Sequence, residues 1–129
     1  MHLKGKNAII LGGTRGIGRA IADTLAGEGA NVAVCARKAD QVAEAVKELE
    51  AMGVNATGTA VDITDGAALK GFIADAAKTL GGLDILISNA GAMAQGNDEA
   101  AWKQNFELDI LGAVNAFEAA QPLLAKAAE

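Results

Sequence analysis

Short runs of Ile, Val, Leu and Ala, separated by longer segments of helical period, constrain the fold of this chain most strongly. The clearest runs extend from Ala8 to Leu11, from Val32 to Cys35 and from Leu83 to Ile87. They lack the polar alternation of a half-exposed strand, so we expect strands that are covered on both faces. Residues 54–61 form a weaker strand candidate, interrupted by Gly58. Strands that are joined by single helices run parallel, so this order predicts a three-layer α/β fold.

The segments between these runs place apolar residues on one face of a helix. Thr64 and Asp98 stand where helix N-caps are expected, and Gly81 suits a helix exit. The last segment predicts one long helix from Trp102 to Leu124, so the alternation indicates a single domain over residues 1–129. The predicted helical faces comprise Ile17, Ile21, Thr24 and Leu25; Val42, Val46 and Leu49; Leu69, Phe72, Ile73, Ala76 and Leu80; and Trp102, Phe106, Ile110, Ala113, Val114, Phe117 and Leu124.

The composition argues against several classes of partner. The chain carries a formal net charge of −5, whereas nucleic-acid-binding proteins usually carry a basic surface. Cys35 is the single cysteine, which excludes an intrachain disulfide and leaves too few ligands for a thiolate metal site. The N-terminus lacks the long apolar region of a signal peptide, and no run of about 18 apolar residues predicts a membrane span. We therefore expect a soluble cytoplasmic protein without nucleic-acid, membrane or metal partners.

A glycine-rich segment, Gly-Gly-Thr-Arg-Gly-Ile-Gly, links the first predicted strand to the first predicted helix. Gly12 permits a tight turn, Gly16 leaves room where a pyrophosphate would lie, and Gly18 lets the helix pack on the sheet. Thr14 adds a hydroxyl donor, and the helix N-terminus presents free N–H groups to a phosphate. No Gly-Lys-Ser/Thr follows, so the segment is not a P-loop. It predicts a site for dinucleotide phosphates, the alternative being glycines that only form a tight turn.

The spacing GxxxGxG resembles the turn of the short-chain dehydrogenase/reductase family, written TGxxxGIG, with Leu11 in place of the usual threonine. Ser88-Asn89-Ala90-Gly91 resembles the family's NNAG motif, and Asp62-Ile63 stands where the family's aspartate holds the adenine ring. The resemblance implies a Rossmann-like, doubly wound parallel sheet, truncated to about four strands in the order 3-2-1-4. The cofactor-binding residues that it implies are Gly12, Thr14, Arg15, Gly16, Ile17, Gly18, Arg37, Asp62, Ile63, Asn89, Ala90 and Gly91.

The end of the second predicted strand bears on the choice of cofactor. NAD-binding sites carry a carboxylate there, which accepts hydrogen bonds from the ribose hydroxyls. Here Ala36 stands in that place and Arg37 follows it, while Arg15 projects from the glycine-rich turn toward the same region. Two guanidinium groups suit a 2′-phosphate, so NADP(H) is predicted to be preferred over NAD(H). The alternative is that both arginines are ordinary solvated surface residues.

The resemblance also implies hydride transfer between a nicotinamide cofactor and a carbonyl or alcohol substrate, with a tyrosine as proton donor. The chain contains no tyrosine, and the family's serine and Tyr-x-x-x-Lys segment would follow Glu129. Asp109 occupies the place of the asparagine in the family's proton relay; the other interpretation is an acid on the helix surface. No catalytic set is complete, so we expect the chain to bind cofactor without turning over substrate.

Two other interpretations stay open: a non-catalytic nucleotide-binding or regulatory module, and a self-assembling truncated fold with no bound cofactor. In the implied strand order, the strand from Leu83 to Ile87 lies at an edge of the sheet. Its unpaired N–H and C=O groups would be available for pairing with another chain. The helix from Trp102 to Leu124 normally packs against another subunit or a further helix. We therefore expect a homodimer, formed through that strand or through this helix.

Overall fold

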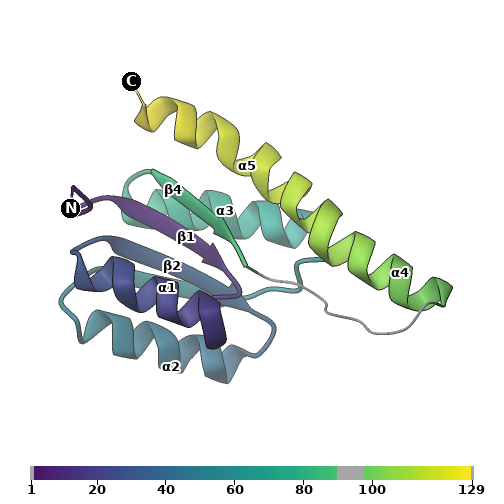
Figure 1. The fold of residues 1–129 in the computed structure, drawn as a ribbon. Helices are drawn as coiled ribbons and strands as arrows, with labels where there is room; N and C mark the ends of the chain where they lie inside the picture. The colour runs from purple at the N-terminus through teal and green to yellow at the C-terminus, as the bar shows by residue number, and fades with distance from the viewer. Residues whose placement is uncertain (1, 90–97, 129) are drawn as a thin grey trace.

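The structure is a computed structural model that describes residues 2–89 and 98–128. Strands and helices alternate along the chain, as the sequence predicts (Figure 1). In chain order the elements are β1 (Asn7–Leu11), α1 (Gly16–Gly27), β2 (Asn31–Ala36), α2 (Ala39–Glu50), β3 (Ala56–Ala60), α3 (Gly66–Leu80), β4 (Ile85–Ser88), α4 (Glu99–Asn105), the π-helical segment η1 (Phe106–Leu111) and α5 (Gly112–Ala127).

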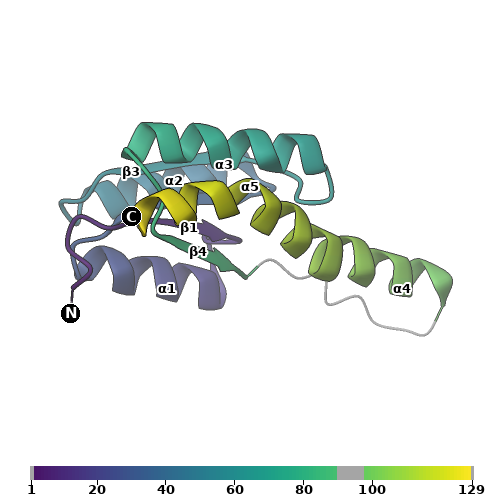
Figure 2. The same ribbon diagram turned by 90° about the horizontal axis from the view of Figure 1, so that it is seen from above.

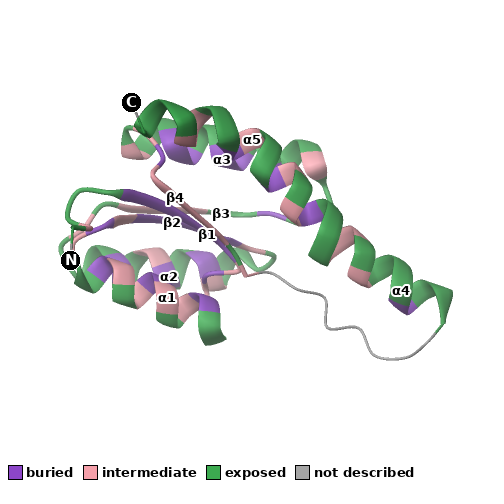
Figure 3. Ribbon diagram, turned by 45° about the horizontal axis from the view of Figure 1, so that its top comes forward, coloured by how far each residue is buried: buried purple, intermediate pink, exposed green. Residues whose placement is uncertain are grey.

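The four strands form one parallel sheet in the order β3-β2-β1-β4, which confirms the predicted topology. The register places Ile9 of β1 beside Ala33 of β2 and Leu86 of β4. Helices α1 and α2 cover one face of the sheet, and α3 and α5 cover the other (Figure 3). The result is the three-layer, Rossmann-like arrangement that the sequence predicts.

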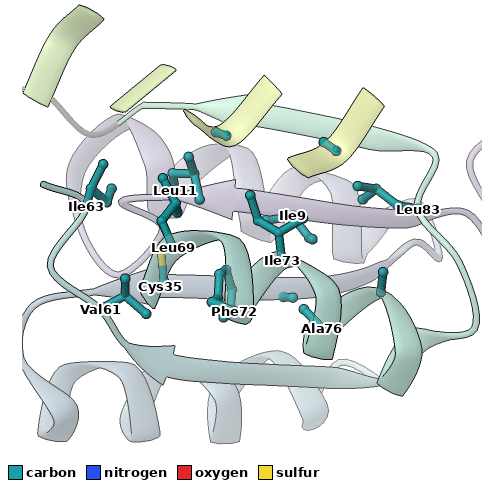
Figure 4. Packing of buried hydrophobic residues seen from close by; sticks show 14 residues of the cluster. Ile9, Leu11, Cys35, Val61, Ile63, Leu69, Phe72, Ile73, Ala76 and Leu83 are labelled. Atoms are coloured by element: carbon teal, nitrogen blue, oxygen red, sulfur yellow. The ribbon is translucent and has the colours of Figure 1, made fainter. Parts of the chain in front are cut away.

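Strand β1 supplies both halves of the core, because successive side chains of a strand point to opposite faces of the sheet. Ile9 and Leu11 belong to the cluster formed with α3 and α5, whereas Ile10 belongs to the cluster formed with α1 and α2. All three side chains are fully buried. Figure 4 shows the first cluster, in which Ile73 of α3 lies over Ile9. The central strand is therefore covered on both faces, as its unbroken apolar run predicts.

Strand β3 is shorter than the predicted strand 54–61, and Gly58 does not interrupt it, because Gly58 pairs with Val34 of β2. A Cβ atom at Gly58 would lie 2.7 Å from Cγ1 of Val42 and 2.9 Å from Cγ2 of Val46. Side chains of α2 thus pack directly over Gly58. Packing between α2 and the sheet requires a glycine at this position. Strand propensity alone does not reveal that requirement.

Polar side chains link the amino ends of the strands. Nδ2 of Asn31 donates to Oδ1 of Asn7 at 3.0 Å, and the backbone N–H of Asn7 donates to Oδ2 of Asp84 at 2.9 Å. The N–H of Asp84 in turn donates to the backbone carbonyl of Asn7 at 2.9 Å. The pairing of β4 with β1 starts directly after this linkage, at Ile85 rather than at the predicted Leu83.

Helix α1 buries part of the predicted face: Ile21 and Leu25 are half-buried against the core, whereas Ile17 and Thr24 are exposed. Its buried residues are Gly18, Ala22 and Ala26, whereas Ile17 is 73% exposed. Small residues spaced four apart lie on one side of a helix and let its backbone approach the sheet closely. The prediction for Ile17 was wrong because a search for apolar periodicity assigns the larger apolar side chains to the buried face. It does not detect that small residues bring the helix backbone close to the sheet.

Helix α3 buries the predicted apolar face, but its N-cap is Asp65 rather than Thr64. Oδ1 of Asp65 accepts a hydrogen bond from the N–H of Ala68 at 3.1 Å. The Thr64 hydroxyl instead donates to the carboxylate of Asp62 at 2.7 Å. Asp98 caps α4, as predicted. Sequence alone did not separate two adjacent capping residues, because both types accept hydrogen bonds from a first helical turn.

The last predicted helix is helical from Glu99 to Ala127, but residues 106–111 form a π-helical segment between α4 and α5. The α4 end of this long helix extends beyond the end of the sheet, as Figure 2 shows from above. Small side chains of α5 are buried where it packs on the core, whereas the larger apolar side chains of the helix point away. The buried residues of α5 are Gly112, Ala116 and Ala120; the exposed large apolar residues of α4, η1 and α5 are Trp102, Phe106, Ile110, Leu111, Val114 and Phe117.

Cys35, near the end of β2, belongs to the core cluster formed with α3 and α5 and is fully buried. Burial raises the pKa of Cys35 to about 11, and the thiolate is the reactive form of a cysteine. We therefore expect iodoacetamide to leave the native protein unmodified near neutral pH and to alkylate it once the chain is unfolded. Mass spectrometry with and without denaturant measures this. Rapid alkylation of the native protein would show that Cys35 is accessible.

Candidate functional site

The carboxyl ends of all four strands surround one cavity of about 380 Å³. Gly12 follows β1, Arg37 follows β2, Asp62 lies two residues after β3, and Asn89 follows β4. The sheet reverses its strand order between β1 and β4, and ligands of open α/β sheets bind at the carboxyl edge beside such a reversal. The cavity therefore occupies the position where this architecture places a ligand.

The turn between β1 and α1 depends on four glycines, of which Gly13 has no room for a Cβ beside Val34. Gly12 has a φ angle of +78° and Gly16 one of +60°, which only glycine adopts readily. At Gly18 the requirement is space, because a Cβ atom there would overlap the backbone carbonyl oxygen of Gly12 and lie 2.8 Å from Nδ2 of Asn89. The missing side chain thus allows α1 to begin directly against the end of β1.

The first turn of α1 has no side-chain cap. Arg15 occupies the N-cap position with an extended backbone, and its side chain makes no capping hydrogen bond. The leading N–H groups of a helix have no partner within the helix, and they carry the positive end of its dipole. Thr14 and Arg15 line the cavity immediately before these donors. This arrangement is chemically suited to phosphate oxygens.

Basic side chains gather on the side of the cavity that is formed by the turn and by the end of β2. Arg15, Arg37 and Lys38 all line the cavity and are exposed. Asp62 lines the same cavity, and hydrogen bonds from Thr64, together with the charge of Arg37, lower the pKa of this carboxyl group. Asp62 is therefore ionised at neutral pH, and these four side chains combine three positive charges with one negative charge.

The loop after β3 is fixed from two directions. Oδ1 of Asp62 accepts hydrogen bonds from the backbone N–H of Thr64 at 3.0 Å and from its hydroxyl at 2.7 Å. Ile63 is buried against the long helix, where a Cβ atom at Gly112 would lie only 2.7 Å from Cγ2 of Ile63. The loop therefore presents Asp62 to the cavity from a well-supported backbone.

Most of the residues predicted for cofactor binding lie together around this cavity, although their role in binding stays a prediction. Those that line it are Gly12, Thr14, Arg15, Arg37, Asp62, Ile63 and Asn89. Gly16, Ile17 and Gly18 form the adjacent first turn of α1. Ala90 and Gly91 lie outside the described residues.

The cavity also contains residues that sequence reasoning did not single out. Lys38 and Gln41 come from the start of α2, and Gln104 and Leu108 come from α4 and η1. The sequence indicated only that the two residues of each pair are three or four positions apart and so share a helix face. It did not show that these faces meet the cavity. Asp109 is exposed on η1 and is not one of the lining residues.

Residues 6–129 match the family model described as short chain dehydrogenase. The chain belongs to this family. Over 125 residues this short-chain dehydrogenase chain is 35% identical to isoepoxydon dehydrogenase of Aspergillus clavatus, a match that covers 95% of the chain and 48% of the relative. It is 34% identical over 122 residues to the 3-oxoacyl-acyl-carrier-protein reductase FabG of Staphylococcus aureus, covering 91% and 50% respectively. The chain thus spans about half the length of the curated relatives that it matches.

Solved structures of the family agree with this assignment. A short chain dehydrogenase from Burkholderia cenocepacia, in complex with NADP, has a TM-score of 0.91 and 34% sequence identity, over 96% of this chain and 53% of that one. A putative short-chain alcohol dehydrogenase from Sinorhizobium meliloti has a TM-score of 0.89 and 38% identity, over 96% of this chain and 51% of that one. The family's fold is therefore present over the strands and helices described above.

Two further properties concern the described part of this short-chain dehydrogenase chain. Within residues 2–89 and 98–128, His, Cys, Asp and Glu side chains form no group of three that could hold a metal ion. Over the same ranges, no helix combines the length and the apolar character that crossing a membrane requires.

Replacing Gly18 tests the close approach of α1 to the turn. Gly18→Ala should lower the free energy of unfolding by about 1–3 kcal/mol, because the new methyl group meets backbone atoms that cannot move aside easily. Gly71→Ala is the matched control: Gly71 lies within α3, and its Cβ would meet no atom within 4 Å. This change should raise stability by about 0.5–1 kcal/mol. Urea denaturation measures both, and an unchanged midpoint for Gly18→Ala would contradict the packing described here.

Proposed function

We propose that this chain is the cofactor-binding part of an oxidoreductase that transfers hydride between NADP(H) and a carbonyl or alcohol substrate. The observation that carries the proposal is the convergence of the glycine-rich turn, the uncapped start of α1 and the ends of four parallel strands on one cavity. Membership of the short chain dehydrogenase family supports it, because the matched region includes every one of these features.

In this proposal each part of the cavity binds a different part of the dinucleotide. Backbone N–H groups in the first turn of α1 bind the pyrophosphate, and Thr14 adds its hydroxyl. Asp62 and Ile63 hold the adenine ring after β3. Asn89, followed by Ala90 and Gly91, completes the site at the end of β4. The bound cofactor supplies or accepts the hydride at its nicotinamide ring, while the chain orients it and holds its negative charge.

The charge around the ribose position favours NADP(H) over NAD(H). Arg15, Arg37 and Lys38 line the cavity, and Ala36 stands where a carboxylate would repel a 2′-phosphate. Two structural neighbours solved in complex with NADP or NADPH are 34% and 32% identical to this chain. Two neighbours solved with NAD are 27% and 26% identical. The higher identity to the NADP-bound and NADPH-bound neighbours supports the same preference.

Calorimetric titration with NADP and with NAD at matched salt tests both binding and preference. We expect tighter binding of NADP, and we expect Arg37→Ala to weaken it by about 10-fold to 100-fold, because a charge-assisted contact to the 2′-phosphate is lost. The affinity for NAD should change little. Lys78→Ala is the matched control, since it removes a cation from the last turn of α3.

The outcomes of this titration separate two claims. Equal affinities, or tighter binding of NAD, would contradict the NADP preference and leave dinucleotide binding intact. Failure of the wild-type chain to bind either dinucleotide would overturn the proposed function itself.

We further propose that these 129 residues do not turn over substrate by themselves. The family resemblance implies a tyrosine as proton donor, and this chain contains none. The curated relatives have about twice the matched length, so the remaining catalytic groups would come from a following segment. Asp109, exposed on η1, stays the candidate for the position of the family's relay asparagine.

We also propose that the chain forms a homodimer through the outward face of its long helix. Trp102, Ile110 and Phe117 are 65%, 53% and 59% exposed, which is unusual for a cluster of large apolar side chains on one helix. The second candidate surface is β4, which pairs only with β1 among the described strands and leaves one edge unpaired.

Sedimentation velocity distinguishes these surfaces. The wild-type chain should sediment as a dimer at micromolar concentration, and the double variant Ile110→Glu/Phe117→Glu should sediment as a monomer. Met52→Glu is the control, because Met52 is 45% exposed but lies after α2, away from the long helix. A dimer that persists in the double variant would favour pairing through β4, and a monomeric wild-type chain would contradict self-association.

A further inference from the structure

The carboxylate of Asp62 is held by only one of its two oxygens. Oδ1 accepts two hydrogen bonds from Thr64, one from the backbone N–H at 3.0 Å and one from the hydroxyl at 2.7 Å. No donor from the described residues bonds to Oδ2. Asp62 is exposed and lines the cavity. One oxygen is thus anchored to the protein, and the other is available to a ligand.

The residues around Thr64 fix the position of this anchor. The N–H of Asp65 donates to the backbone carbonyl of Asp62 at 2.9 Å, which closes the turn. Oδ1 of Asp65 accepts from Ala68 in the first turn of α3 at 3.1 Å, and Ile63 is buried beside Gly112. The backbone that carries the Thr64 hydroxyl is therefore tied to the start of α3.

We propose that Thr64 is a positioning residue, which orients Asp62 so that its Oδ2 accepts a hydrogen bond from the 6-amino group of the adenine ring. The inference rests on the proposed dinucleotide binding, to which the adenine contact of Asp62 belongs; the new element is the dependence of base selectivity on Thr64. An ionised carboxylate only accepts hydrogen bonds. A 6-amino purine satisfies it, whereas a 6-oxo purine places a second acceptor against it.

The hydrogen bonds from Thr64 have a second effect on the same carboxylate. They stabilise its charged form and so lower the pKa of Asp62, and the charge of Arg37 acts in the same direction. Thr64 therefore holds the acceptor in one orientation and also keeps it ionised. Removing the hydroxyl weakens both effects, but leaves the backbone hydrogen bond in place.

The test compares base selectivity in Thr64→Val and Thr64→Ser. The ligands are the better-bound nicotinamide dinucleotide and its hypoxanthine analogue, in which a carbonyl replaces the 6-amino group. The wild-type chain should bind the adenine form more tightly, and Thr64→Val should reduce this ratio about threefold to tenfold, the effect of one lost hydrogen bond. Thr64→Ser should retain the ratio. Thr59→Val, the same change on β3 away from Asp62, should also retain it.

A second measurement needs no ligand. Carboxyl-carbon NMR should show a higher pKa for Asp62 in Thr64→Val than in the wild-type chain, and an unshifted pKa in Thr64→Ser. Should Thr64→Val not fold, Thr64→Ala replaces it in both measurements.

Each outcome decides between the claims. A reduced ratio in Thr64→Val that Thr64→Ser restores supports the inference. An unchanged ratio in Thr64→Val, or equal binding of both bases by the wild-type chain, overturns it while dinucleotide binding stands. Absence of all dinucleotide binding overturns the proposed function, and the inference with it.

Discussion

The approach of Gly18 to the backbone carbonyl of Gly12 is the constraint on which the rest of the site depends. It allows α1 to start against the end of β1, so that uncapped N–H groups lie beside the cavity. The turn is held in place because the N–H of Gly12 donates to the carbonyl of Cys35 in β2 at 2.9 Å. The buried strands thus hold the turn in place, and the turn positions the electropositive N-terminus of α1.

Small residues also determine how the long helix supports the opposite side of the cavity. Gly112 accommodates Ile63, and a Cβ atom at Gly66 would lie 3.0 Å from Nδ2 of Asn115. The helix therefore lies close to the loop after β3 and to the start of α3, while its large apolar side chains face outward. One helix in this way combines support of the site with an exposed apolar surface.

The fold and the location of the site could be predicted because they depend on patterns that are local in sequence. Apolar runs indicated buried strands, and the glycine spacing with the residues after each strand indicated the cavity. The errors arose where packing between distant segments decides. Ile17 is exposed because Gly18 allows closer packing. Position 58, which pairs within β3, is a glycine because α2 leaves no room for a side chain there. The contributions of Gln104 and Leu108 likewise depend on how the long helix docks.

The most direct test of the account is an NMR titration that follows the backbone amides during addition of NADP. Since the first turn of α1 is proposed to bind the pyrophosphate, the amide signals of residues 14–18 should shift most, together with those of residues 62–64. The amides of residues 81–84, at the amino edge of the sheet, should stay unchanged. Saturable binding that leaves the signals of residues 14–18 unmoved would contradict the central claim.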